Sequence, residues 1–148
     1  MTRSTIQLGS KLVSQFSKPY IIAEIGVNHE GSIDKAFELI KLAKDGGADA
    51  VKFQSYKADT LASKNSPAYW DLAKEKTQSQ HELFMKYDSF NEEDYIRLAS
   101  FSGSLDIDFL STPFDDASID FLDPLMPFYK VASADLTNTP FLRKIARK

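Results

Sequence analysis

The chain has 148 residues, a formal net charge of -3, a hydrophobic fraction of 43% and a charged fraction of 26%, which suits one domain with a hydrophobic core. Acidic and basic residues are mixed along it, which argues against a nucleic-acid surface, and without cysteine it can form neither disulfides nor thiolate metal sites. No apolar run approaches the roughly 20 residues that a membrane span requires, and Met1 to Ser10 lack the apolar core of a secretory signal. We therefore expect a soluble cytoplasmic protein.

From about residue 19 the chain repeats one unit: a short apolar run, a polar loop and an amphipathic helix. The run Tyr20–Ile25 is apolar and partly β-branched, which predicts a buried strand. Ser32 is suited to cap the helix that follows, and the glycines at 46–47 end it. Asp49–Gln54 then predicts a second strand.

The second half of the chain continues the same alternation. Asn91 is suited to cap a helix whose first turn is acidic. Ile107–Ser111 predicts a third strand, and a short helix starts at Asp115. Pro127–Ala132 predicts a fourth strand, and one more helix is expected over 139–148.

Two stretches fall outside this alternation. The segment 55–90 is long for a connector, and its middle, from Tyr69 to Tyr87, has a partly helical pattern. Insertions of this length are more often functional loops over a site than plain connections. The stretch before residue 18 is ambiguous and is compatible with a small hairpin. Nothing indicates a domain boundary.

Strands that alternate with helices imply parallel strands joined by right-handed crossovers. An open doubly wound sheet would carry a phosphate-binding turn after its first strand, but the glycines of Gly26–Gly31 do not have that spacing. A closed barrel instead carries polar functional residues at the C-terminal ends of several strands. We therefore expect the α/β class, of the (β/α)8 TIM-barrel type, with about the first four βα units present. A half-barrel has two unpaired edges, and a homo-oligomer through these edges is an arrangement that the fold allows.

Polar side chains mark the ends of all four predicted strands. Because residues two apart share a strand face, Glu24 follows Ile22 toward the rim and Gln54 follows Lys52. A buried carboxylate or ammonium is costly without a partner. A structural Lys52–Glu24 ion pair and a catalytic role for both therefore remain open alternatives.

Several residues at these strand ends could together bind an anion. The groups with the charge and the hydroxyl donors for a phosphate or carboxylate are Lys52, Thr112, Lys130 and Ser133. The groups that could hold hydroxyls or a metal are Glu24, Gln54 and Asp135. We expect an anionic substrate together with a polyhydroxylated one.

Four motifs carry a resemblance to a known family. Ala23–Gly31, Val51–Gln54, Ser111–Asp115 and Tyr129–Ser133 resemble, in order and spacing, the signatures of the sialic acid (N-acetylneuraminate) synthase family. Tyr56–Leu61 and the Tyr69-Trp70 pair look more like the bacterial legionaminic or spore-coat-type synthases than like the animal enzyme. The resemblance implies that residues 1–148 form the N-terminal half of the barrel domain.

The implied activity is a phosphoenolpyruvate-dependent transferase reaction. Phosphoenolpyruvate condenses with an N-acetylated hexosamine to give a nine-carbon sialic-acid-type 2-keto-3-deoxy sugar acid and phosphate. The resemblance assigns phosphoenolpyruvate to Lys52, Thr112, Lys130 and Ser133, and it assigns the sugar or the attacking water to Glu24 and Gln54. The remaining residues that it implies at the site are Asn28, His29 and Asp135. Asp135 stands where many members carry Glu near the metal.

The resemblance also implies a divalent cation, Mn²⁺ or Mg²⁺, for the full enzyme. The family's metal-binding histidines lie on later strands, outside residues 1–148. His29 and His81 have no metal-site spacing, and His81 is predicted to be a loop residue.

Two other interpretations stay open. The chain could be a non-catalytic half-barrel that binds or assembles with another chain, because its edges would be unpaired. It could also be another phosphoenolpyruvate–aldose condensing enzyme of the 3-deoxy-sugar-acid type, although the sequence signatures of those enzymes differ from the motifs quoted above.

Overall fold

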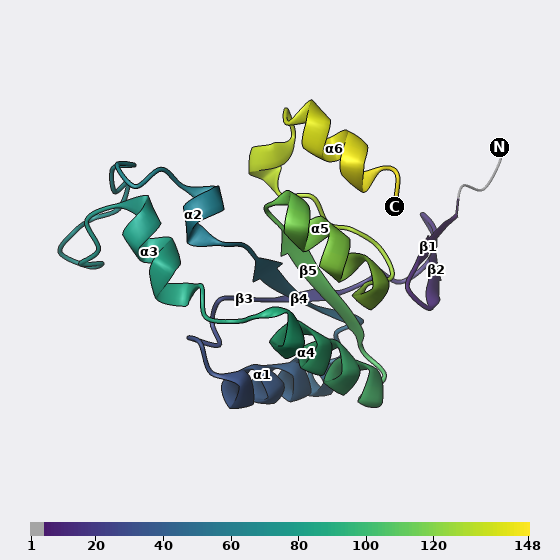
Figure 1. Cartoon of the computed structure of the whole chain (residues 1–148). Coiled ribbons are helices and arrows are strands. Elements are labelled where there is room, and N and C mark those ends of the chain that lie inside the picture. Colours follow the sequence, from purple (N-terminus) through teal and green to yellow (C-terminus); the bar gives the residue numbers. More distant parts are fainter. Residues whose placement is uncertain (1–4) are drawn as a thin grey trace.

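A three-stranded parallel sheet lies at the centre of the computed structural model, which describes residues 5–148 (Figure 1). Its strands are β3 (Ile22–Gly26), β4 (Ala50–Ser55) and β5 (Asp108–Pro113), in the order β3-β4-β5. The register places Glu24 beside Lys52 on the neighbouring strand. The first three predicted strands and their parallel arrangement are therefore confirmed.

Three helices cover one face of this sheet: α1 (Ile33–Asp45), α4 (Glu92–Ser104) and α5 (Asp116–Leu122). Helices α1 and α4 lie side by side below the sheet in Figure 1. The predicted caps are confirmed: the Ser32 side chain accepts a hydrogen bond at the start of α1, and Asn91 forms a capping box at the start of α4. These caps fix where the loops from the strand ends enter the helices.

The hydrophobic core lies between the sheet and these helices. Strand residues Val51, Phe53 and Phe109 are at most 4% exposed and pack against Leu98 of α4. Side chains alternate along a strand, so Lys52 and its face-sharing neighbours point to the other side of the sheet.

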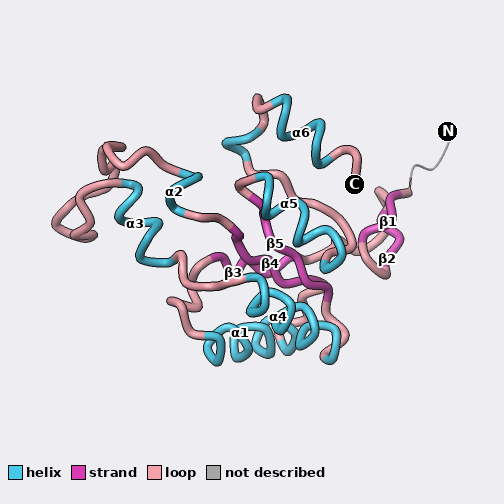
Figure 2. The backbone as a smooth tube through the Cα atoms, in the orientation of Figure 1, coloured by secondary structure: helices cyan, strands magenta, loops and turns pink. Residues whose placement is uncertain are grey.

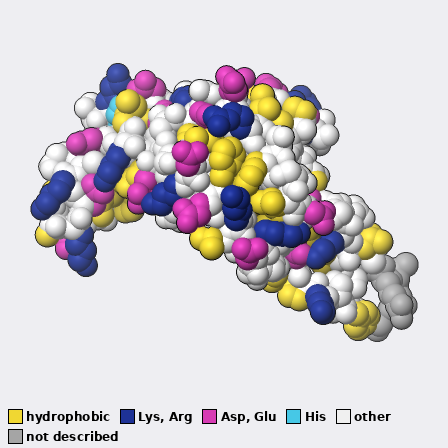
Figure 3. All heavy atoms as spheres, turned by 90° about the horizontal axis from the view of Figure 1, so that it is seen from below, with side chains coloured by type: hydrophobic (Ala, Val, Ile, Leu, Met, Phe, Trp, Pro, Cys, Tyr) yellow, Lys and Arg dark blue, Asp and Glu magenta, His cyan; other side chains and the backbone are white. Residues whose placement is uncertain are grey.

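The face that α1 and α4 present to solvent carries both signs of charge. Viewed from below, dark-blue and magenta side chains are interspersed with hydrophobic ones (Figure 3). This face therefore has no extended basic surface of the kind that nucleic acids select.

An antiparallel hairpin precedes the sheet, as the sequence allowed. It consists of β1 (Ile6–Leu8) and β2 (Lys11–Val13). The Lys11 ammonium pairs with Asp49, the residue before β4, and the same carboxylate accepts a hydrogen bond from the Ile21 backbone N–H at 2.8 Å. The hairpin is thus tied to the N-terminal ends of the strands, opposite the predicted site.

The long insertion forms an arm that extends away from the sheet (Figure 1). It holds two helices, α2 (Ala58–Leu61) and α3 (Gln80–Tyr87). Helix α3 confirms the partly helical pattern predicted for 69–87, and α2 lies before that stretch. His81 lies in α3, and its Nε2 is 2.8 Å from an oxygen of Asp59. The prediction that His81 is a loop residue is therefore wrong: the Ser79 side chain accepts a hydrogen bond from the Glu82 backbone N–H and caps the helix that contains His81.

The predicted fourth strand, Pro127–Ala132, is wrong. Figure 2 draws the backbone between the end of α5 and the last helix without a strand, and the segment forms no ladder with β5. The Ser111 backbone N–H of β5 instead lies 2.9 Å from the Met126 sulfur. The Tyr129 hydroxyl is 3.0 Å from the Ile119 carbonyl oxygen of α5. The Tyr129 contact holds the segment against α5, and the Met126 contact with β5 takes the place of backbone pairing there.

Three short elements complete the chain. Two 3-10 turns, η1 (Asp123–Leu125) and η2 (Ser133–Asp135), flank this segment, and α6 (Thr139–Ile145) follows. Helix α6 packs Phe141 onto Ile119 of α5, which confirms the last predicted helix. Within residues 5–148, no helix is long and apolar enough to cross a membrane.

Candidate active site

Lys52 is the centre of a polar cluster at the C-terminal end of the sheet. Its ammonium pairs with the Glu24 carboxylate and donates a hydrogen bond to the Thr112 hydroxyl at 3.1 Å. Lys52 and Thr112 are 6% and 1% exposed, whereas the Glu24 side chain is 49% exposed. The structure therefore brings together one predicted residue from each strand, and it contains the Lys52–Glu24 ion pair that the sequence left open. The buried ammonium is paired and hydrogen-bonded, as a charge in such a place must be.

Gly26 shapes the rim beside this cluster. Its φ is +56°, a conformation that glycine adopts at low cost, and the β3–β4 register shifts between Glu24 and Gly26. A Cβ at this position would lie 3.2 Å from Glu24 Oε1 and 3.6 Å from Gln54 Nε2. Gly26 thus leaves room for Glu24 and Gln54 to approach each other. Sequence reasoning missed this role, although a glycine directly follows the predicted strand Tyr20–Ile25.

Tyr95 supports the cluster from the helix side of the sheet. Its hydroxyl donates a hydrogen bond to the Gln54 backbone carbonyl at 2.8 Å. Burial raises the pKa of the Tyr95 hydroxyl to about 12, so it stays a neutral donor. On the same side, the hydroxyls of Ser55 and Ser111 lie 2.7 Å apart and join β4 to β5. Sequence reasoning missed these residues, because a helix residue 41 positions after Gln54 gives no local sign of contact.

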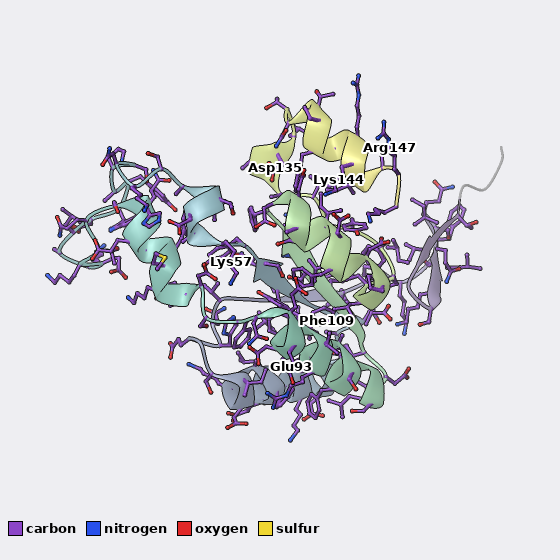
Figure 4. All side chains as sticks on the ribbon, viewed as in Figure 1. Lys57, Glu93, Phe109, Asp135, Lys144 and Arg147 are labelled. Atoms are coloured by element: carbon purple, nitrogen blue, oxygen red, sulfur yellow. The ribbon has the colours of Figure 1, made fainter. Side chains whose placement is uncertain are left out.

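Three predicted residues of the last segment are not joined to this cluster. Lys130 is half-buried, and Ser133 is exposed in η2. Asp135, labelled in Figure 4 near α6, accepts a hydrogen bond from the Asn138 amide at 3.3 Å. Within residues 5–148, no hydrogen bond or ion pair connects them to Glu24, Lys52 or Thr112. Their roles stay predictions.

The comparison with known protein families decides the relationship. Residues 39–148 match the NeuB family, which is well over half of the chain. The chain belongs to the NeuB family. The resemblance seen in the four motifs is confirmed, and the Lys52 cluster is a site in a NeuB-family chain.

Individual relatives of this NeuB-family chain are longer than it is. It is 44% identical over 132 residues to the N,N'-diacetyllegionaminic acid synthase of Legionella pneumophila, covering 87% of this chain and 37% of that protein. It is 35% identical over 145 residues to the spore coat polysaccharide biosynthesis protein SpsE of Bacillus subtilis, covering 97% and 38%. The crystal structure of the N-acetylneuraminic acid (sialic acid) synthetase of Leptospira borgpetersenii serovar Hardjo-bovis, in complex with citrate, superposes with a TM-score of 0.82 at 29% identity. That match covers 98% of this chain and 47% of the synthetase. The chain spans less than half the length of these relatives.

His29 of the NeuB-family motif lies in the core, not beside Lys52. It is 3% exposed and stacks on Phe90, with ring centroids 4.1 Å apart. Its Nδ1 accepts a hydrogen bond from the Gly31 backbone N–H at 3.1 Å. Burial, with a smaller effect from Lys35, lowers the pKa of the imidazole to about 4, so the ring is neutral at pH 7. The neighbouring Asn28 is exposed. A substrate role for His29 and Asn28 stays a prediction.

The neutral state of His29 predicts acid sensitivity. Its ordinary pKa of 6.5 applies to the unfolded chain and about 4 to the folded one, so the unfolded state binds the proton more readily. The stabilisation is fully present above pH 6.5 and is lost as the pH falls toward 4, by on the order of 2 to 3 kcal/mol. Urea unfolding between pH 7.5 and 4 should show this slope, and a His29→Gln variant should lose it. The matched His81→Gln variant should keep it; an unchanged slope in His29→Gln would contradict the assignment.

The described part of this NeuB-family chain does not form a metal site. Residues 5–148 bring together no three His, Asp or Glu side chains that could hold an ion. The Glu24 carboxylate is paired with Lys52, and Nδ1 of His29 is occupied by a backbone N–H.

Proposed function

We propose that this chain provides the phosphoenolpyruvate-binding part of a NeuB-family synthase. The reaction would condense phosphoenolpyruvate with an N-acetylhexosamine to give a nine-carbon sialic-acid-type 2-keto-3-deoxy sugar acid and phosphate. The observation that carries the proposal is the buried Lys52 ammonium beside Thr112 and Glu24, at the C-terminal ends of parallel strands. Active sites of β/α barrels are found at this end of the strands. The names of the legionaminic and sialic acid relatives support an amino-sugar acceptor.

Lys52 and Thr112 suit the anionic end of phosphoenolpyruvate. An ammonium and a hydroxyl at 3.1 Å from each other can both donate to one phosphate or carboxylate group. An arriving anion competes with Glu24 for the ammonium. The Glu24 carboxylate, which is half exposed, can then turn to a substrate hydroxyl or to a water molecule. Lys130 and Ser133 would add further donors when the last segment closes on the anion.

The bond changes of the proposed reaction balance without a further reactant. The C3 carbon of phosphoenolpyruvate forms a bond to the aldehyde carbon of the sugar, and water adds at C2. The C2–O bond to phosphate then breaks, and phosphate leaves. In this scheme Lys52 neutralises the anion so that the two reactants can lie in contact, and Glu24 and Gln54 orient the water or the acceptor hydroxyls.

We extend the proposal to the whole enzyme. Residues 1–148 would be the N-terminal half of a (β/α)8 barrel, which the parallel order β3-β4-β5 supports. Mn²⁺ or Mg²⁺ would serve the whole enzyme with ligands from outside residues 5–148, and a cytoplasmic location stays a prediction.

Titration with phosphoenolpyruvate tests the proposal. We expect saturable shifts of the Lys52 and Thr112 backbone amide signals in ¹H-¹⁵N NMR spectra, with weak affinity because part of the cradle is not assembled. Addition of N-acetylmannosamine and Mn²⁺ should release little phosphate from this chain alone. Unshifted amides at millimolar phosphoenolpyruvate would contradict the proposed site, and rapid phosphate release would show that the chain needs no further part.

A second candidate function is assembly through the sheet edges without catalysis. Within residues 5–148, the outer edges of β3 and β5 have no strand partner, and Ile21 and Ile22 next to one edge are 49% and 37% exposed. Unpaired edges favour pairing with another strand. Light scattering after size exclusion tests this second candidate function. A clean monomer of 16.6 kDa would contradict pairing between copies.

A further inference from the structure

A cavity of about 300 Å³ lies on the helix side of the sheet, away from Lys52. It opens between the first turns of α4 and α5 and the segment that follows β4. Ser55 lines it and alternates with Gln54 along β4, so the cavity and the Lys52 cluster lie on opposite faces of the same strand. Both helices that form its walls are within the described residues. The cavity is therefore a second site, independent of the function proposed above.

The walls of this cavity are aromatic. The aromatic side chains that line it are Tyr56, Phe90, Tyr95 and Phe121. The rings of Phe90 and Tyr95 are 6.0 Å apart and inclined by 82°, and those of Tyr95 and Phe121 are 5.6 Å apart at 44°. Rings at several inclinations offer both apolar contact and electron-rich faces, and such faces attract cations.

Three acidic residues also line the cavity. They are Glu92, Asp115 and Asp116. Asp116 lies 3.8 Å from the Lys144 ammonium, whereas Glu92 and Asp115 form no ion pair with any residue of 5–148. Asp115 is held in place by hydrogen bonds from the Ser118 backbone N–H at 2.7 Å and the Thr60 hydroxyl at 3.2 Å, so its position is fixed.

Lys57 is the one lysine of the lining, and its charge is already compensated. Figure 4 shows it where the arm joins β4. Its ammonium lies 2.7 Å from the Asp88 carboxylate and 3.3 Å from the Phe90 carbonyl oxygen. Asp88 lies outside the lining but offsets this ammonium, so Lys57 does not neutralise the carboxylates of Glu92 and Asp115. The combination of aromatic walls with the carboxylates of Glu92 and Asp115 disfavours anions and favours organic cations.

We propose that this cavity binds a small organic ammonium ion, with its alkyl groups against the aromatic rings and its charge near Asp115 and Glu92. Aromatic enclosures with nearby carboxylates are the chemistry that recognises quaternary ammonium groups. The volume is at the lower end of the range for small-molecule pockets, which limits the ligand to a compact amine.

Choline and its neutral isostere 3,3-dimethylbutan-1-ol test the role of charge. The two have the same shape, and only choline is charged. Followed by ¹H-¹⁵N NMR, choline should give saturable shifts at Tyr95 and Phe121, with an affinity about tenfold higher than that of the alcohol. Equal affinities would overturn the proposal and leave an apolar pocket, and so would sulfate that shifts the same signals more strongly than choline.

Charge-removing variants test the assigned residues. Asn can still cap a helix, so Asp115→Asn combined with Glu92→Gln should fold and should weaken choline binding by about fivefold to tenfold. Glu93→Gln is the matched control: it lies next to Glu92 in the first turn of α4 but not in the lining, and it should bind choline as the wild type does. Unaltered choline binding by the double variant would overturn the assignment.

Discussion

Replacement of Lys52 by methionine should abolish phosphoenolpyruvate binding and leave the chain folded. The substitution removes a buried donor that contacts both Glu24 and Thr112. Loss of a charged hydrogen-bonding partner in a desolvated site costs about 2 to 4 kcal/mol of binding free energy, which is on the order of a hundredfold in affinity. Isothermal titration or NMR with phosphoenolpyruvate measures this loss directly.

The stability of the Lys52→Met variant should change little for a specific reason. The partner carboxylate of Glu24 is 49% exposed, so it can be solvated by water when the ammonium is gone. Thr112 loses one hydrogen bond, at about 1 kcal/mol, and the methionine side chain fills the apolar part of the space. Removal of one partner of an ion pair is costly when the other charge stays buried, and the exposure of Glu24 avoids that cost.

Lys57→Met is the matched control, because it makes the same chemical change at a lysine five residues away. That lysine is paired with Asp88 at the base of the arm, outside the Lys52 cluster, so phosphoenolpyruvate affinity should be retained. Tight binding by Lys52→Met, or loss of binding by Lys57→Met alone, would contradict the proposed anion site. Circular dichroism of each variant shows whether it is folded before binding is measured.

The sequence predicted the alternation along β4 because each residue there follows a local, period-two pattern. It could not predict that Pro127–Ala132 stays unpaired. A ladder depends on the neighbouring strand as much as on propensity, and here the Met126 sulfur takes the Ser111 N–H of β5. The local motif around His29 likewise gave no sign that Phe90, about sixty residues later, stacks on its ring.

The meeting of the three strand ends was predictable from the order of the parallel strands. Parallel strands place their C-terminal ends on one edge, so Glu24, Lys52 and Thr112 are brought together by the order of the strands alone. The positions of Lys130 and Ser133 depend instead on how a segment without backbone pairing settles against α5. Local sequence carries little information about such contacts.

Phe53→Ala, one position after Lys52, should destabilise the fold and leave phosphoenolpyruvate binding intact. Phe53 is fully buried on the helix side of β4, with its ring 5.7 Å from that of Phe109 and 6.0 Å from that of His29. Truncation of such a ring costs about 3 to 5 kcal/mol through lost apolar contact and the cavity left behind. Since small domains have only about 5 to 15 kcal/mol of stability in total, the variant should be close to unfolding at 37 °C.

Urea unfolding at 25 °C measures the loss, with Phe16→Ala as the matched control. Phe16 is 75% exposed, so the same truncation there should change the free energy of unfolding by less than about 0.5 kcal/mol. The folded fraction of Phe53→Ala should still bind phosphoenolpyruvate, because its substitution lies on the face of β4 opposite Lys52. A loss of stability below about 1 kcal/mol would contradict the assigned core, and a folded Phe53→Ala protein without affinity would show that the two faces of the strand are not independent.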